Sequence, residues 1–372
     1  MQTLKSINNY KLHPKTTMKT FFPKQILMLA FAMFVGFVIT ACDDDDEAPA
    51  VDKTELQEAI DAAIDRLATT EEGINDGQFT AEDRAALQSA IDAAEAVIDD
   101  ASVTQEQVDN AGVALNNAVD AYNESEIAPV AEADLVAHWS FDEGTGTVAS
   151  DNSANGFDGE FKTGHIDWGA GFPEWAEDRN GEDGKALHFN EGANIEIPYN
   201  TNLNPQQMTI ALWINADEIN ENNRFIGLNS WIAYKFQLQT SNVPFYTVST
   251  EPNVYLNFDA KVALPINEWH HIAVTFGDGK MTFYIDGVMP EGAMYETPGE
   301  AVSISDMPYN LVIGQDFPTD QYAADDSNFE VDHKIPLAWG GYFRGFLDEI
   351  RIYKAPLTAA QIETIYNREK PE

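Results

Sequence analysis

The spacing of apolar residues changes near residue 130, and this change divides the chain into two parts that need different folds. Before that point apolar side chains recur every three or four residues, as in the stripe Leu56, Ile60, Ile64 and Leu67. After it they alternate with polar ones, as in Met208 to Asn215. A period of 3.6 residues is typical of an amphipathic helix, and a period of two indicates a strand with one buried face. We therefore expect a small all-α domain followed by an all-β domain.

Residues 51–126 are predicted to form a three-helix bundle. Two further stripes follow the first, at Leu87, Ile91, Ala94 and Ile98 and at Val108, Ala111, Leu115, Val119 and Tyr122. Thr54, Thr80 and Thr104 precede the three helices, and each is predicted to cap the backbone with a partner three residues later. The segment resembles FIVAR-type modules of bacterial surface proteins. Its carboxylates are expected on solvent faces, so our interpretation is a spacer, with binding of a partner protein as the alternative.

The N-terminal residues 1–41 are predicted to be a signal peptide, whose translation could start at Met18. The apolar run from Ile26 to Ile39 has 14 residues, fewer than the roughly 20 that cross a bilayer. It ends in Ile39-Thr40-Ala41-Cys42, which resembles the lipobox of bacterial lipoproteins and implies that Cys42 becomes lipidated. Residues 42–50 form an acidic linker that resembles the export tag of surface lipoproteins. We expect a lipid-anchored protein at the cell surface of an outer membrane.

The charge of the chain narrows the set of partners. Asp and Glu number 62 against 21 Lys and Arg, for a net charge of −41. Such a surface repels phosphate backbones and anionic lipids, which argues against nucleic acid and against membrane contact other than through the lipid anchor. Cys42 is the only cysteine, so no disulfide can form within the chain. A hydrophobic content of 44% is too high for a disordered chain.

Residues 133–368 resemble the laminin-G-like, concanavalin A-like jelly-roll domains. Four segments carry the resemblance in the expected order, at residues 135–144 (LVAHWSFDEG), 151–156 (DNSANG), 268–276 (EWHHIAVTF) and 345–353 (GFLDEIRIY). The resemblance implies a two-sheet sandwich whose first and last strands pair, closed by a helix from Thr358 to Arg368. The segment from Asp316 to Tyr342 is longer than that family usually has. Members of this family mostly bind sugars or proteins, and some relatives cleave glycans.

A calcium site is the first candidate for chemistry. Asp151, Ser153 and Asn155 stand at steps of two before Gly156, a spacing that places three oxygens inside a tight loop. Calcium takes six to eight oxygens, and we expect Asp348, with Asp142 as a weaker candidate, to complete the shell. Such an ion would stabilise the fold. The alternative is an Asx-turn in which Asp151 binds the nearby backbone.

A glycan site is the second candidate, since sugars bind to aromatic rings surrounded by polar groups. The candidate ligand-binding aromatics are Trp168, Trp175, Trp231, Tyr246, Trp339 and Tyr342. Trp168 and Trp175 lie in a glycine-rich loop, whereas Trp339 and Tyr342 flank Gly340-Gly341 in the long insertion. Alternation also puts Lys235, Gln237 and Gln239 on one polar strand face that can line a groove. The alternative for each aromatic residue is packing in the core.

Enzymatic activity is the reading that the sequence supports least. Retaining glucanases of related jelly rolls place two glutamates on a strand reading Glu-x-Asp-x-x-Glu. The nearest stretch, Glu330 to Ile335, ends in isoleucine and lacks the second carboxylate. We therefore expect a non-catalytic, calcium-stabilised, lectin-like protein whose partner is a polysaccharide or another glycan. An adhesin that binds a surface protein or matrix is the alternative, and a glycan-cleaving enzyme is the second alternative.

Overall fold

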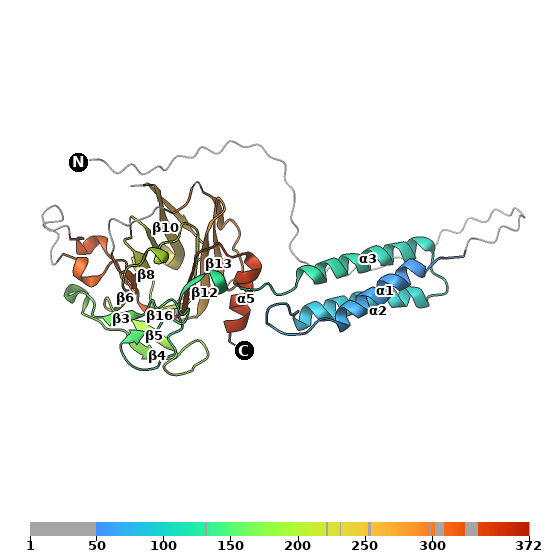
Figure 1. Cartoon of the computed structure of the whole chain (residues 1–372), viewed down its shortest axis with the longest axis horizontal. Helices are drawn as coiled ribbons and strands as arrows, with labels where there is room; N and C mark the ends of the chain where they lie inside the picture. The colour runs from blue at the N-terminus through green and yellow to red at the C-terminus, as the bar shows by residue number, and fades with distance from the viewer. Residues whose placement is uncertain are drawn as a thin grey trace, which may run out of the picture. The chain divides into compact units, whose positions relative to one another are not determined.

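The computed structural model describes residues 50–371 except 131, 221, 231, 252–253, 298, 302–308 and 324–333. The predicted signal peptide and the lipidation site at Cys42 lie outside the described residues, as do Trp231 and the stretch from Glu330 to His333. Three helices, α1 (Thr54–Ala68), α2 (Ala81–Asp99) and α3 (Gln105–Glu124), precede a region of strands, as Figure 1 shows. None of the helices in the described part of the chain is long and apolar enough to span a bilayer.

The helix boundaries confirm two of the three predicted caps. The side chains of Thr80 and Thr104 accept hydrogen bonds from the backbone amides of Asp83 and Gln107, and Thr104 forms a full capping box. The prediction for Thr54 is wrong, because Thr54 is the first residue inside α1 and Lys53 occupies the cap position. The Lys53 ammonium donates to the carbonyls of Ile98 and Asp100 at 2.7 and 2.8 Å. A tertiary contact to the end of α2 thus accompanies the start of α1 in place of a local cap.

The predicted apolar stripes form the core of the bundle except at Ile64, which is 42% exposed, while its neighbour Ala63 is buried. The buried side chains include Leu56, Ile60 and Leu67 of α1, Leu87 and Ile91 of α2, and Val108, Leu115 and Tyr122 of α3. Phe79, in the loop before α2, stacks on Tyr122 with ring centroids 4.2 Å apart. The Phe79 and Tyr122 side chains are the only aromatic ones of the bundle, and both are buried, so the bundle presents no exposed ring to a ligand.

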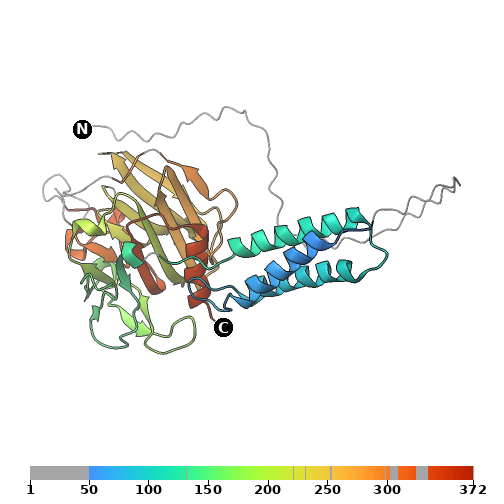
Figure 2. The same cartoon turned by 45° about the vertical axis from the view of Figure 1, so that its right-hand side comes forward.

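The strands form two antiparallel sheets, which we call sheet 1 and sheet 2 (Figures 1 and 2). Sheet 1 has the order β14-β13-β12-β7-β16-β5-β4, with β1 also paired to β16. Sheet 2 has the order β11-β10-β9-β8-β15-β6-β3-β2. The bounds are β1 Leu135–Trp139, β2 Val148–Ala149, β3 Gly159–Lys162, β4 Glu174–Ala176, β5 Ala186–Phe189, β6 Asn194–Ile197, β7 Met208–Ala216, β8 Asn223–Leu228, β9 Tyr234–Gln239, β10 Val243–Glu251, β11 Val254–Asp259, β12 His270–Gly277, β13 Lys280–Ile285, β14 Met294–Glu296, β15 Leu311–Ile313 and β16 Gly345–Tyr353.

The sheet register confirms the fold class. First strand β1 pairs with last strand β16, with Trp139 opposite Ile350. The two inner faces meet in one core, to which β7 contributes Ile210, Leu212 and Ile214 and β9 contributes Phe236. These are the residues that alternation assigned to one face. The molecule therefore has a small helical bundle followed by a two-sheet jelly-roll sandwich.

Helix α5 (Ala359–Glu369) covers part of the outer face of sheet 1, beside β12 and β13 in Figure 1. The predicted helix begins at Thr358; in the structure Thr358 is the N-cap, and its side chain forms a capping box with Gln361. Ile362 and Ile365 pack on Ala211, Ala273 and Tyr284 of the sheet. His271, two residues before Ala273 on the same face of β12, is fully buried against the rings of Trp213 and Tyr366.

His271 makes the stability of the sandwich depend on pH. Burial, together with the smaller effect of the Arg351 charge, lowers the pKa of His271 to about 3. An exposed histidine in the unfolded chain titrates near 6.5, so below that pH the unfolded chain binds more protons. The contribution of neutral His271 to stability is therefore complete above about pH 6.5. It falls by up to about 1.4 kcal/mol per pH unit as the pH falls toward 3.

We predict that the free energy of unfolding of His271→Phe falls less between about pH 6.5 and 4 than that of the wild type. The reason is that phenylalanine keeps a ring beneath α5 and binds no proton. Urea unfolding of wild type and variant across this range measures the effect. His188→Phe is the matched control, since His188 lies in β5 of the same sheet, is half-buried and bonds Asp217 at 2.9 Å. Equal pH slopes for wild type and His271→Phe would contradict the assignment.

Candidate functional site

A hollow of about 220 Å³ brings together residues from three separate segments of the sandwich. Trp168 ends the 3-10 helix η2 (Ile166–Trp168), Asn220 and Asn222 lie between β7 and β8, and the rest come from the long insertion around the 3-10 helix η6 (Leu337–Trp339). The lining residues are Trp168, Asn220, Asn222, Leu337, Ala338, Gly340, Gly341 and Tyr342. Two of the predicted ligand-binding aromatics, Trp168 and Tyr342, therefore line the same hollow.

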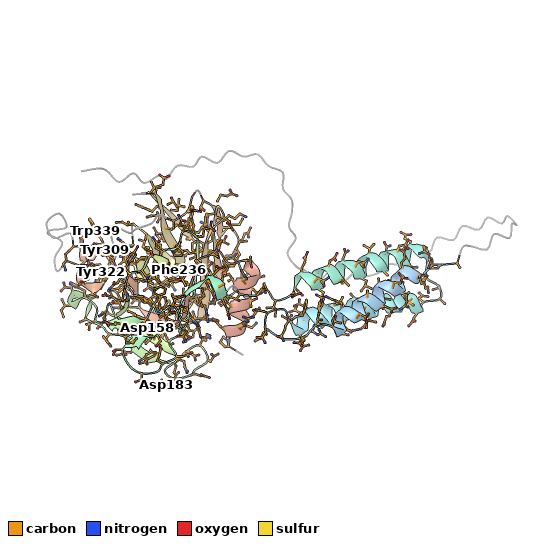
Figure 3. The ribbon with its side chains drawn as sticks, viewed as in Figure 1. Asp158, Asp183, Phe236, Tyr309, Tyr322 and Trp339 are labelled. Atoms are coloured by element: carbon orange, nitrogen blue, oxygen red, sulfur yellow. The ribbon has the colours of Figure 1, made fainter. Side chains whose placement is uncertain are left out.

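The aromatic rings of this site contact one another. The ring centroids of Trp168 and Tyr342 are 5.0 Å apart, and those of Trp168 and Tyr322 are 4.8 Å apart. Trp339, the last residue of η6, keeps 55% of its surface exposed. Figure 3 labels Trp339 and Tyr322 at one end of the sandwich. Trp339 itself does not line the hollow, but in the sequence this exposed residue stands between the lining residues Ala338 and Gly340.

Local backbone geometry positions Trp168. The η2 turn is capped by His165, whose Nδ1 accepts the amide of Asp167 at 3.2 Å, and Gly169 ends it in a left-handed conformation. The Trp168 ring packs directly over Gly192, where a Cβ atom would come within 2.8 Å of the indole. A glycine at this position is therefore needed to seat the ring.

The insertion is held by a buried carboxylate at its first residue, Asp316. The Asp316 carboxylate accepts hydrogen bonds from the guanidinium of Arg224, the hydroxyl of Tyr322 and the amide of Gly341, the last at 3.2 Å. Arg224 also donates to the carbonyl of Trp339 at 2.7 Å. Since both Asp316 and Arg224 are buried, this network ties the start of the insertion to its end and orients the rings between them.

The insertion crosses strand β8 at close range. A Cβ on Gly227 would lie 2.5 Å from the Cα of Asp316, and a Cβ on Gly341 would lie 2.4 Å from the carbonyl oxygen of Asn222. Both positions therefore require glycine because the two backbones touch. At β8 the insertion therefore covers the outer face of sheet 2.

The structure corrects the predicted polar groove on β9. Lys235 and Gln237 do share the outer face of β9, but both are buried, and only Gln239 at the strand end is exposed. In the ladder Gln237 is the partner of Arg224 and Lys235 is the partner of Gly227, so these side chains lie behind the insertion. Burial lowers the pKa of Lys235 to about 7, and the charge of Arg224 contributes in the same direction. Alternation identified the face correctly but not the segment that covers it.

Two other aromatic candidates lie elsewhere. Tyr246 is 0% exposed in the middle of β10, where its hydroxyl contacts the sulfur of Met208 at 2.8 Å, so its prediction as a binding residue is wrong. Trp175, in edge strand β4, packs against Phe161 at 5.6 Å, and its indole donates to the carbonyl of Gly146 at 3.1 Å. Its contacts are with the core and the β1–β2 loop instead of the Trp168 hollow. Trp231 lies outside the described residues.

Sequence reasoning missed the polar residues of the hollow. Asn220 and Asn222 stand two residues apart, and the amide of Asn222 donates to the side chain of Asn220 at 3.0 Å. Asp316 lies three residues after the buried strand β15. An acid so close to a buried strand is the sequence signal that could have identified it. Arg224 gave a similar signal as a charged residue inside the apolar strand β8.

The predicted calcium loop is held by its own hydrogen bonds. The carboxylate of Asp151 accepts the amides of His138, Ser153 and Phe157 at 2.9 to 3.0 Å and the hydroxyl of Ser153 at 2.8 Å. Partial burial raises the pKa of Asp151, but these hydrogen bonds outweigh it and lower the pKa overall. Asn155 donates to the carbonyls of Leu135 and Val136, and Gly156 adopts φ +79°. This is the geometry of the Asx-turn alternative.

The two acids expected to complete the calcium shell have other partners. Asp348 is buried and pairs with Arg179, whose guanidinium also lies over the ring of Trp213. Asp142 pairs with Lys185 at 3.3 Å. No group of three or more His, Cys, Asp or Glu side chains suited to a metal is present in the ranges that the structure describes. The donor set around Asp151 therefore does not fit the predicted shell, and calcium binding itself stays a prediction.

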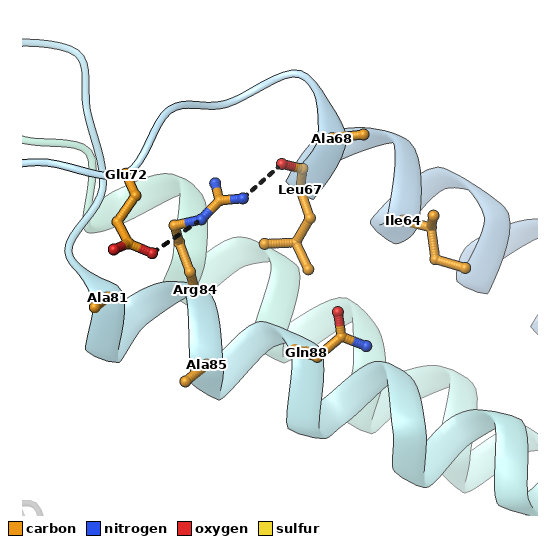
Figure 4. A pocket seen from close by; sticks show the side chains of 8 residues that line it. All are labelled: Ile64, Leu67, Ala68, Glu72, Ala81, Arg84, Ala85 and Gln88. Atoms are coloured by element: carbon orange, nitrogen blue, oxygen red, sulfur yellow. Dashed lines mark hydrogen bonds and ion pairs between the residues drawn. The ribbon is translucent and has the colours of Figure 1, made fainter.

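A second, larger hollow lies on the bundle between α1 and α2 and holds about 510 Å³ (Figure 4). Ile64, Leu67 and the methyl groups of Ala68, Ala81 and Ala85 contribute its apolar surface. Arg84 donates to the carbonyl of Leu67 at 3.0 Å and lies 3.8 Å from Glu72. Arg84 thus binds polar groups within the hollow, whereas the side chain of Gln88 donates to Asp92, and none of the described residues that line the hollow is aromatic.

Comparison with known proteins supports the description of both parts. Residues 189–363 match the family model of the concanavalin A-like lectin/glucanases superfamily, and residues 52–123 match the model of the FIVAR domain. The strand-rich part is thus concanavalin A-like, and the helical part is FIVAR-like. No curated protein matches the sequence.

Solved structures with a similar fold include domain 4 of AbnA, a GH43 extracellular arabinanase from Geobacillus stearothermophilus, in complex with arabinotriose. That match has 20% identity and a TM-score of 0.46, and it covers 63% of this chain and 98% of the other. The binding domain of Paraclostridial Mosquitocidal Protein 1 matches at 16% identity and a TM-score of 0.45, with 64% and 52% covered. The binding domain of botulinum neurotoxin DC in complex with SialylT matches at 11% and 0.39, with 64% and 51% covered. The matched region thus spans about half the length of the two toxin binding domains.

We predict that Asp316→Asn destabilises the sandwich by about 3 kcal/mol, because it leaves the buried Arg224 without its counter-charge. Urea unfolding followed by tryptophan fluorescence measures the change. Asp320→Asn, an exposed substitution in the same segment, is the matched control and is expected to change stability by less than about 0.5 kcal/mol. Equal stability of the two variants would show that the buried pair does not hold the insertion.

We predict that Asp151→Ala destabilises the sandwich by about 2 kcal/mol, because it removes the acceptor of three backbone amides. The hydrogen bonds alone predict the same loss in excess calcium and in excess chelator, measured as the unfolding midpoint. A wild-type midpoint that rises with calcium, together with a variant midpoint that does not, would instead support the predicted calcium site.

Proposed function

We propose that this chain is a non-catalytic carbohydrate-binding protein whose ligand binds in the hollow lined by Trp168 and Tyr342. The observation that carries the proposal is the convergence of these two rings, 5.0 Å apart, with the side chains of Asn220 and Asn222 in one hollow. The aromatic faces would cover the apolar face of a sugar ring. Amide side chains both donate and accept hydrogen bonds, as sugar hydroxyls do.

The match to a lectin and glucanase superfamily leaves both binding and cleavage open, and the hollow favours binding. Glycoside hydrolysis generally uses two carboxyl groups that flank the scissile bond. None of the residues that the structure describes as lining the hollow is an acid. Asp316, the acid directly behind it, is buried and accepts three hydrogen bonds. The proposed role of the domain is therefore capture of a glycan.

The rest of the chain is proposed to display this domain. Lipidation of Cys42 would anchor the protein in the outer membrane, and the FIVAR-like bundle would separate the sandwich from the cell surface. A calcium ion near Asp151 would add stability if the loop binds one. Protease shaving of intact cells tests this arrangement, since a surface protein is degraded and one facing inward is protected.

A protein ligand is the second candidate, and exposed apolar side chains near the hollow favour it. Ile166 is 74% exposed and Ile219 is 62% exposed, and both are sequence neighbours of lining segments. Such side chains can contact a partner surface in an adhesin. Competition separates the two candidates, because free oligosaccharide blocks binding to cells or matrix only if the ligand is a glycan.

We predict that Trp168→Ala weakens glycan binding at least about tenfold, equal to ~1.4 kcal/mol, because the sugar loses its stacking surface. Isothermal titration calorimetry with the best ligand from a glycan array measures the affinity. Phe172→Ala is the matched control, since Phe172 is an exposed ring of the same loop outside the lining. Unchanged affinity in folded Trp168→Ala and Trp339→Ala would exclude this hollow as the binding site.

A further inference from the structure

The lining of the Trp168 hollow differs in charge from the protein around it. The chain has a net charge of −41, yet none of the eight lining side chains is an acid or a base other than the phenol of Tyr342. Polar contact is supplied by Asn220, Asn222 and the phenol. A ligand in this hollow would therefore meet hydrogen-bonding groups without a full charge.

The two arginines that contact lining residues are already neutralised. Arg224 donates to the side chain of Asn222 at 3.5 Å and pairs with Asp316. Arg344 lies 3.3 Å from Glu218 and donates to the hydroxyl of Tyr342 at 3.2 Å. Each cation thus has a carboxylate partner, so neither brings an uncompensated positive charge to the hollow. Among the described residues of the lining, a carboxylated or sulfated sugar would find no unpaired cation, and it would meet the repulsion of the acidic surface.

The size of the hollow limits how much ligand it holds. Its volume of about 220 Å³ lies below the roughly 300 to 1,000 Å³ of pockets that enclose a drug-sized molecule. One sugar ring is a suitable occupant, with neighbouring rings outside it near the exposed indole of Trp339. The site would then recognise one ring of a longer chain.

We infer that the ligand is an uncharged glycan, one ring of which occupies the hollow between Trp168, Tyr342 and the two asparagines. This inference rests on the proposed function and adds the charge class of the ligand. It excludes uronic-acid and sulfated polymers as preferred ligands. Because no ionic contact forms, the affinity for the neutral glycan should change little with salt.

The test uses the full chain and pairs of polysaccharides that share a backbone and differ only in charge. Methyl-esterified and de-esterified homogalacturonan form one pair, and a neutral glucan and its C6-oxidised form are another. The neutral member should bind about tenfold or more tightly at low salt. Raising the salt concentration should change the affinity for the neutral polysaccharide less than about twofold. It should also reduce the difference in affinity between the two members, because salt screens the repulsion of the charged one.

The outcomes separate this inference from the function on which it rests. Equal or tighter binding of the charged member, lost in Trp168→Ala, would overturn the inference and leave glycan binding at this site intact. Failure of every polysaccharide in a broad panel to bind would overturn both. Ala338→Lys adds a cation at the exposed edge of the hollow and should strengthen binding of the charged member. Ala360→Lys, on the exposed side of α5, is its control, and equal effects of the two would contradict this placement of the ligand.

Discussion

The buried pair of Arg224 and Asp316 is the interaction on which the candidate site depends. Removing two charges from water is costly, and the cost is offset only when each charge is paired and hydrogen-bonded, as these are by Tyr322, Gly341 and Trp339. The pair links β8 of the sandwich to both ends of the 316–342 insertion. The sheets supply a rigid support. The insertion covers part of the outer face of sheet 2 and contributes lining residues, Tyr342 among them, to the hollow.

Much of the fold could be predicted because periodicity reflects burial directly. The apolar stripes predicted the three helices, alternation predicted the strand faces, and the family resemblance implied the pairing of β1 with β16, which the register shows. The exception at Thr54 has a physical reason. A cap is a local hydrogen bond, whereas the start of α1 coincides with a distant contact from Lys53 to the end of α2, which no local pattern encodes.

The site could be predicted only in part, and the errors share one cause. Trp168, Trp339 and Tyr342 stood out because large rings beside glycines in loops have few packing partners along the chain. Lys235 and Gln237 were placed on the correct strand face, but alternation cannot show that another segment covers that face. The prediction for Tyr246 failed because the sequence did not show that this residue lies in the middle of β10 with its ring in the core. Asn220 and Asn222 become part of the site only when β7, β8 and the insertion meet in space.

The most direct test of the central claim is the response of the tryptophan indole signals in an NMR titration with a neutral oligosaccharide. The chain has seven tryptophans, of which Trp168 lines the hollow, Trp339 stands between two lining residues in the sequence, and Trp139 and Trp213 are buried. The account predicts that the signals of Trp168 and Trp339 shift on saturation and that those of Trp139 and Trp213 stay in place. Saturable binding that leaves the Trp168 and Trp339 signals unmoved would contradict it.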